Sequence, residues 1–68
     1  MSQIDFYRAR AAEALSAAEA TTLPAVRERN QRSAAAWQQM AEQLERLEVQ
    51  KARNLADKAE RAPYSATG

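Results

Sequence analysis

The chain has 68 residues with no cysteine and no histidine, and ten Lys or Arg against nine Asp or Glu give a net charge of +1. This composition excludes a disulfide framework and a Cys- or His-based metal site, and it lacks the basic excess of typical nucleic-acid-binding proteins. A single core of this size rarely supplies more than roughly 3–5 kcal/mol, so oligomerisation is the remaining conventional source of stability.

The residue content favours helices throughout. Ala, Glu, Gln, Arg and Leu dominate the sequence and are strong helix formers, whereas Val, Ile, Tyr and Phe are too scattered to alternate as strands. We therefore predict an all-α protein. No apolar run approaches the ~18 residues of a membrane span, and the first twenty residues lack the apolar region of a signal peptide. We expect a cytoplasmic protein.

A first helix is predicted over 3–20. Ser2 has the position of an N-cap, and Asp5 supplies a negative charge in the first turn. Apolar residues follow at steps of three and four, which places them on one helical face. These are Ile4, Tyr7, Ala11, Ala14 or Leu15, and Ala18.

A turn over 21–23 and a long second helix over about 23–61 are predicted next. Pro24 is tolerated in the first turn of a helix but not in its interior. The apolar face of this helix carries Val26, Ser33, Trp37, Met40, Leu44 and Leu47, after which the spacing shifts. We expect Pro63 to end the helix and 63–68 to form a flexible tail.

Two helices joined by so short a turn are normally antiparallel neighbours, so the chain predicts a hairpin over 1–62. If the turn is centred at Thr22, Tyr7 faces Trp37 and Ile4 faces Met40. Trp37 is then a core anchor, although a tryptophan here could also serve at an interface. Ala11 and Ala18 would lie opposite Ala34 and Ala41, either to let the backbones approach closely or simply as helix formers.

The arms of this hairpin are unequal in length. Counted outward from the turn, the first helix reaches only to the level of Met40. About twenty residues of the second helix, or ~30 Å, are therefore left uncovered. Contiguous exposed apolar side chains usually mark a binding surface. We therefore predict a homo-oligomer, with a dimer as first choice, that assembles as a coiled-coil bundle. The predicted interface residues are Leu44, Leu47, Val49 and Leu55, together with Phe6, which is expected to face away from the helix–helix contact.

A second surface is suggested by Arg27, Arg29 and Arg32, which lie near a helix N-terminus where the macrodipole disfavours cations. They could pair with Glu13 and Glu19 on the first helix, which is the favoured interpretation. They could instead form a basic patch for phosphate or nucleic acid.

Catalysis finds little support in the sequence. None of the hydroxyl side chains has a histidine to activate it, and Glu42, Glu45 and Glu48 have the spacing of a solvated helix face. We predict that the protein is not an enzyme and holds no cofactor or metal.

Three stretches of the sequence resemble motifs of a known group of proteins. They are Phe6-Tyr7-Arg8, the turn Thr22-Leu23-Pro24-Ala25-Val26-Arg27-Glu28-Arg29, and Arg32-Ser33-Ala34-Ala35-Ala36-Trp37. Over about residues 4–46 the chain resembles a group of short uncharacterised proteins of alphaproteobacterial type, in which a Thr-Leu-x-x-Val-Arg-Glu-Arg turn and an Arg-x-x-x-Ala-Trp helix recur. The resemblance implies a bacterial origin and carries no function with it.

The predicted function is a small protein–protein interaction module, such as an adaptor, regulator or accessory subunit. It would self-associate and recognise partners through the apolar stripe of the second helix. The alternative is a nucleic-acid-associated regulator that uses the arginine patch. An amphipathic membrane-surface helix is disfavoured, because the polar face holds as many acids as bases.

Overall fold

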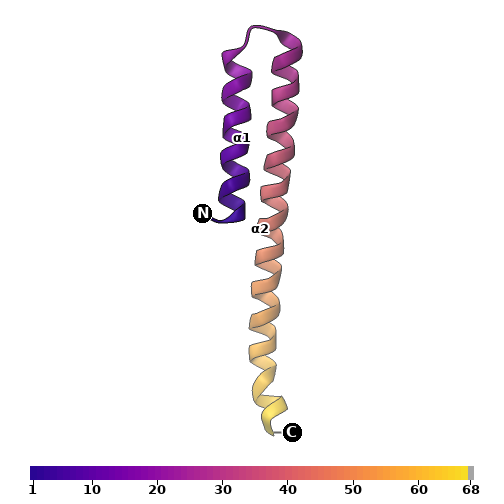
Figure 1. The fold of residues 1–68 in the computed structure, drawn as a ribbon. Helices are drawn as coiled ribbons and strands as arrows, with labels where there is room; N and C mark the ends of the chain where they lie inside the picture. Colours follow the sequence, from indigo (N-terminus) through magenta and orange to yellow (C-terminus); the bar gives the residue numbers. More distant parts are fainter. Residues whose placement is uncertain (68) are drawn as a thin grey trace.

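The computed structural model describes the backbone of residues 1–67 and the side chains of residues 1–61. It contains α1 (Gln3–Ala20, 18 residues) and α2 (Pro24–Thr67, 44 residues), which fold back on each other as a hairpin with unequal arms (Figure 1). The prediction of an all-α hairpin and the bounds of the first helix are confirmed.

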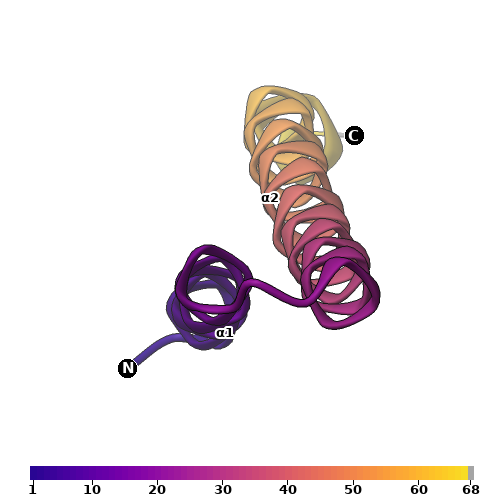
Figure 2. The same cartoon turned by 90° about the horizontal axis from the view of Figure 1, so that it is seen from above.

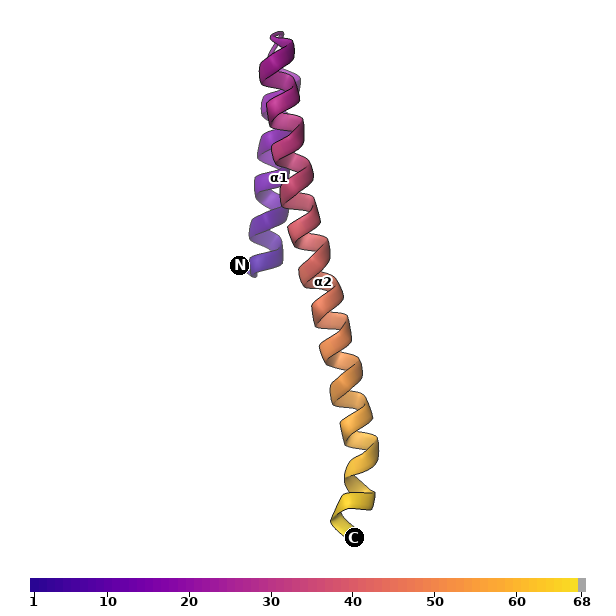
Figure 3. The same cartoon turned by 90° about the vertical axis from the view of Figure 1, so that its right-hand side faces the viewer.

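The molecule is elongated, with extents of 67 × 20 × 10 Å and a radius of gyration of 19.5 Å. A compact domain of this length would have a radius of gyration of about 11 Å. The difference comes from α2, which continues far beyond the N-terminus of α1 (Figure 3). Seen from above, α2 also slants away from the axis of α1 (Figure 2). This geometry leaves the lower part of α2 without a covering helix.

The start of α1 follows the predicted capping pattern. The Ser2 hydroxyl accepts a hydrogen bond from the Asp5 amide at 3.0 Å, and the Ser2 carbonyl accepts one from the Phe6 amide at 3.0 Å. The Asp5 carboxylate adds negative charge to the first turn, where it complements the helix dipole.

The turn between the helices is held by two hydrogen bonds to Thr21. Its hydroxyl accepts from the Leu23 amide at 3.2 Å, and its carbonyl accepts from the Arg27 guanidinium at 3.1 Å. Arg27 thus reaches back from α2 to the C-terminal end of α1, where the helix dipole favours a cation. This contact explains an arginine that is unfavourably placed with respect to its own helix.

The core of the hairpin is a seam of four alanines, which we call the alanine seam. Ala11 and Ala18 on α1, and Ala34 and Ala41 on α2, are the fully buried side chains among residues 1–61, each 1–3% exposed. Both pairs have seven-residue spacing, so each pair lies on one face of its helix. All four alanines therefore lie in the helix–helix contact, with the two of α1 and the two of α2 on facing sides as the sequence predicts.

Two details of α2 differ from the predictions, namely how far α1 covers it and where it ends. The cover provided by α1 extends to Glu45 rather than ending at Met40, because Arg8 forms an ion pair with Glu45. Side chains lean toward the N-terminus of their own helix, so in an antiparallel pair they reach residues beyond those level with them.

The second difference is that α2 continues to Thr67, past the predicted end at Pro63. Since proline has no amide N–H, the helix continues there with one backbone hydrogen bond fewer. The predicted tail over 63–68 lies outside the residues whose side chains are described, and its flexibility stays a prediction.

Candidate interaction surface

One long edge of the hairpin carries an aromatic cluster formed by Phe6, Tyr7 and Trp37. The ring centroids are 5.6 Å apart for Tyr7 and Trp37, 6.1 Å for Phe6 and Trp37, and 6.0 Å for Phe6 and Tyr7. The Arg10 guanidinium lies over the rings of Phe6 and Trp37 at 5.8 and 5.5 Å. The predicted meeting of Tyr7 with Trp37 is confirmed.

The predicted orientation of Phe6 is wrong. Its ring meets Trp37 edge-on, so it belongs to the helix–helix contact rather than facing away from it. It nevertheless remains 44% exposed. The Phe6 backbone lies off the alanine seam, but its long aromatic side chain reaches across to Trp37 of α2. Helical spacing gives the direction of a side chain and not its reach, so it did not indicate this contact. Phe6 can therefore contact α2 and a partner at the same time.

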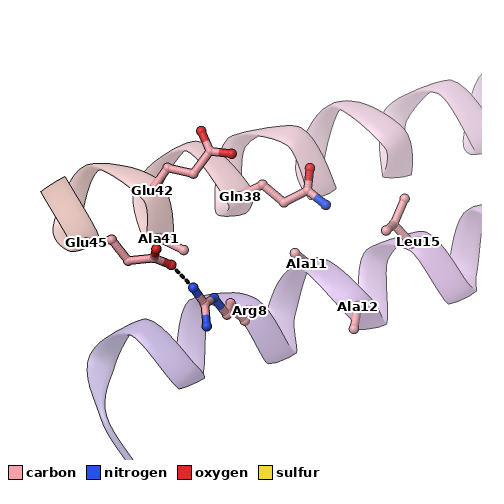
Figure 4. A pocket seen from close by; sticks show the side chains of 8 residues that line it. All are labelled: Arg8, Ala11, Ala12, Leu15, Gln38, Ala41, Glu42 and Glu45. Atoms are coloured by element: carbon pink, nitrogen blue, oxygen red, sulfur yellow. Dashed lines mark ion pairs between the residues drawn. The ribbon is translucent and has the colours of Figure 1, made fainter.

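The opposite edge is polar. There Arg8 forms an ion pair with Glu45, and Gln38 and Glu42 extend the polar surface along α2 (Figure 4). The Arg8 and Glu45 side chains are 58% and 42% exposed, so solvent screens the pair and its contribution is about 0–1 kcal/mol. An apolar partner would have to desolvate these charges. The aromatic edge also carries an ion pair, between Arg10 and Glu13, but there the Arg10 guanidinium already lies over two aromatic rings.

The predicted interface residues of α2 are exposed to different degrees. Leu44 is half-buried beside α1, whereas Leu47, Val49 and Leu55 are 52–59% exposed. At about 100° per residue, Leu44, Leu47 and Leu55 fall within an arc of about 80°. Val49 lies about 160° from Leu47, among the charged side chains of Arg46 and Arg53. A single flat partner can cover the three leucines but not Val49.

The three arginines of the alternative site do not converge. Arg27 is bound to the Thr21 carbonyl, and Arg32 forms an ion pair with Glu28 at 2.6 Å. Arg29 lies about 60° from Arg32 and about 160° from Arg27 around the helix. Glu13 pairs with Arg10 of its own helix at 3.2 Å and not with an arginine of α2. This arrangement gives no support to a shared anion site.

Residues 1–61 contain no group of three acidic side chains arranged to hold a metal ion. In the described part of the chain, no helix is long and apolar enough to cross a membrane. The conspicuous features of this molecule are therefore its aromatic edge and the exposed leucines that continue from it.

No protein family model matches the chain, and comparisons with curated proteins and with solved structures found no match either. The resemblance to short alphaproteobacterial proteins therefore stays a prediction.

Proposed function

We propose that this protein is a small, non-enzymatic protein–protein interaction module that self-associates and binds partners through the apolar stripe of α2. The observation that supports this most directly is an inversion of the usual pattern of burial. Among residues 1–61 the fully buried side chains are alanines, while Leu47 and Leu55 are 57% and 59% exposed.

The energetics of the hairpin support the same conclusion. The core of the hairpin is small, because its fully buried side chains among residues 1–61 are four alanines and each buries little apolar surface. Burying the exposed leucines against another helix would supply apolar contact that a single hairpin lacks.

The mode of recognition follows from the shape. An amphipathic helix binds through side chains at steps of three, four and seven, and Leu44 and Leu47 continue from Trp37 at such steps. The exposed apolar residues begin where α1 still provides cover and extend below it. A partner helix could therefore rest against both the aromatic edge and the uncovered part of α2.

The test is sedimentation of the wild type and of Leu47→Glu at tens of micromolar protein. We expect the wild type to be dimeric or larger and Leu47→Glu to be monomeric, because a carboxylate at this position would have to be desolvated. Gln39→Glu is the matched control, since it adds the same charge at an exposed position about 100° from Met40 and should leave the oligomer intact. A monomeric wild type would refute the self-association.

A further inference from the structure

Three residues of α2 form a line beside the aromatic cluster, and we call them the central stripe. They are Ser33, Met40 and Leu47, which follow one another at seven-residue steps and so lie on one side of the helix. Met40 is 39% exposed and Leu47 is 57% exposed, while Ser33 is half-buried. The stripe lies about 100° from Ala41, outside the alanine seam. It is thus an exposed surface next to an interface that already exists.

The upper end of the central stripe opens onto a recess between the helices. This recess has a volume of about 370 Å³, and its lining combines small and polar side chains and Trp37 with the ion pair of Arg10 and Glu13. Its lining residues are Arg10, Glu13, Ala14, Ala17, Asn30, Ser33 and Trp37. The lower end of the stripe is the protruding Leu47. One end of the stripe is therefore a hollow and the other a projection.

We propose that a second copy of the chain covers this stripe, with the two α2 helices antiparallel and Met40 on the two-fold axis. This inference rests on the proposed self-association and specifies its geometry. Because Ser33 and Leu47 are each seven residues from Met40, the two-fold places Leu47 of one copy against Ser33 of the other. Each leucine then lies against Ser33, at the edge of the recess of the other copy, and the two-fold repeats this contact at both ends of the stripe.

A second contact of this arrangement is apolar on both sides. Leu44 lies four residues after Met40 and Trp37 three residues before it, on the same side of the stripe, so Leu44 of one copy meets Trp37 of the other. Trp37 already packs on Tyr7 and Phe6, and the dimer contact is therefore continuous with the contact inside each hairpin. A parallel, in-register pairing would instead set each leucine against the same leucine of the other copy.

The antiparallel arrangement also accounts for part of the uncovered helix. With Met40 on the axis, residues 46–56 of one copy lie beside residues 24–34 of the other. The uncovered part of each α2 thereby gains a neighbour over about 16 Å. Leu55 lies near the end of this overlap and contributes little to it, which separates this geometry from a dimer formed by the lower ends of α2.

Charge opposes the dimer at its two rims. Arg29 and Lys51 each lie eleven residues from Met40, so Arg29 of one copy approaches Lys51 of the other at both ends. Like charges at exposed positions repel, and salt screens this repulsion. The geometry therefore predicts a dimer that tightens as ionic strength rises and that a charge reversal at one rim position would strengthen.

Disulfide trapping tests the axis directly, because the natural chain contains no cysteine. A disulfide requires Cα atoms within about 7 Å, so only residues near their own symmetry mates can cross-link as single variants. We expect Met40→Cys to form a covalent dimer under mild oxidation, and Ser33→Cys with Leu47→Cys to do so only when both are present. Gln38→Cys, on the polar edge, should remain monomeric on a denaturing gel and is the matched control.

Lys51→Glu is the second variant, and it leaves the core untouched. It replaces two Arg–Lys repulsions by two Arg–Glu attractions, and we expect a dimer about fivefold tighter in low salt. Efficient cross-linking through Leu55→Cys without cross-linking through Met40→Cys would overturn the geometry while preserving self-association. Unchanged or weaker dimerisation of Lys51→Glu would also overturn it. A monomeric wild type would instead refute the proposed function itself.

Discussion

The two halves of α2 have similar helix-forming sequences but different surroundings. In the upper half, 24–45, Ala34 and Ala41 are fully buried against α1. In the lower half, 46–61, every residue is exposed, including two leucines and a valine. Burial in this protein therefore follows the position of α1 and not the hydrophobicity of the side chain. The lower half is held by local interactions such as the 3.1 Å hydrogen bond between Gln50 and Asn54.

Local interactions of this kind stabilise a helix by only about 0.2–0.5 kcal/mol per pair, and short isolated helices are marginal in water. The upper half should consequently depend on tight packing, and the lower half on whatever partner covers it. Paired substitutions, one in each half, can separate these two sources of stability.

The largest difference is expected for enlarging an alanine. Ala34→Leu places extra methyl groups in a seam where the original side chain is 1% exposed, and we expect a loss of about 1–3 kcal/mol in the free energy of unfolding. Ala52→Leu makes the same change in the exposed lower half and should alter stability by less than about 0.5 kcal/mol. Urea denaturation followed by circular dichroism, at one fixed protein concentration, measures both. Equal effects would mean that the seam is not the core.

A smaller difference is expected for shortening a side chain. Trp37→Ala removes the ring that contacts Tyr7 and Phe6, and we expect a loss of about 2–3 kcal/mol, below the value for a fully buried tryptophan. Trp37→Phe should retain much of that stability, because the aromatic contact persists. Val49→Ala, in the exposed lower half, should cost less than about 0.5 kcal/mol. The same denaturation measurement applies, and a similar cost at both positions would contradict the proposed difference between the halves.

The hairpin could be predicted from the sequence because its determinants are local. Ser2 and Pro24 mark the starts of the helices, and the short turn requires the helices to be antiparallel. Once the midpoint is set at Thr22, counting outward brings Tyr7 to Trp37, and the alanines at seven-residue spacing fall on facing sides.

What could not be predicted depends on side-chain reach and direction. Counting residues ended the cover of α1 at Met40, but Arg8 leans toward its own N-terminus and meets Glu45. Counting likewise turned Phe6 away, although its ring extends to Trp37. Arg27 binds a backbone carbonyl across the turn, which no charge pattern indicates. The recess beside Ser33 requires both helices in place and has no sequence signal of its own.

The smallest expected effect lies at the border between the halves, where Arg8 bridges α1 to Glu45. Both side chains are about half exposed, so Arg8→Ala should cost no more than about 1 kcal/mol, and the cost should shrink as salt is added. Arg46→Ala removes the same charge one residue beyond Glu45, and we expect no measurable change in the free energy of unfolding.

Because the lower half has no neighbour within the chain, weakening the contact between Arg8 and Glu45 should extend the exposed segment of α2 upward. Faster amide hydrogen exchange over 42–45 in Arg8→Ala, with unchanged exchange over 28–36, is the corresponding observation. Uniformly faster exchange along α2 would show instead that the helix opens as one unit and that its two halves are not independent.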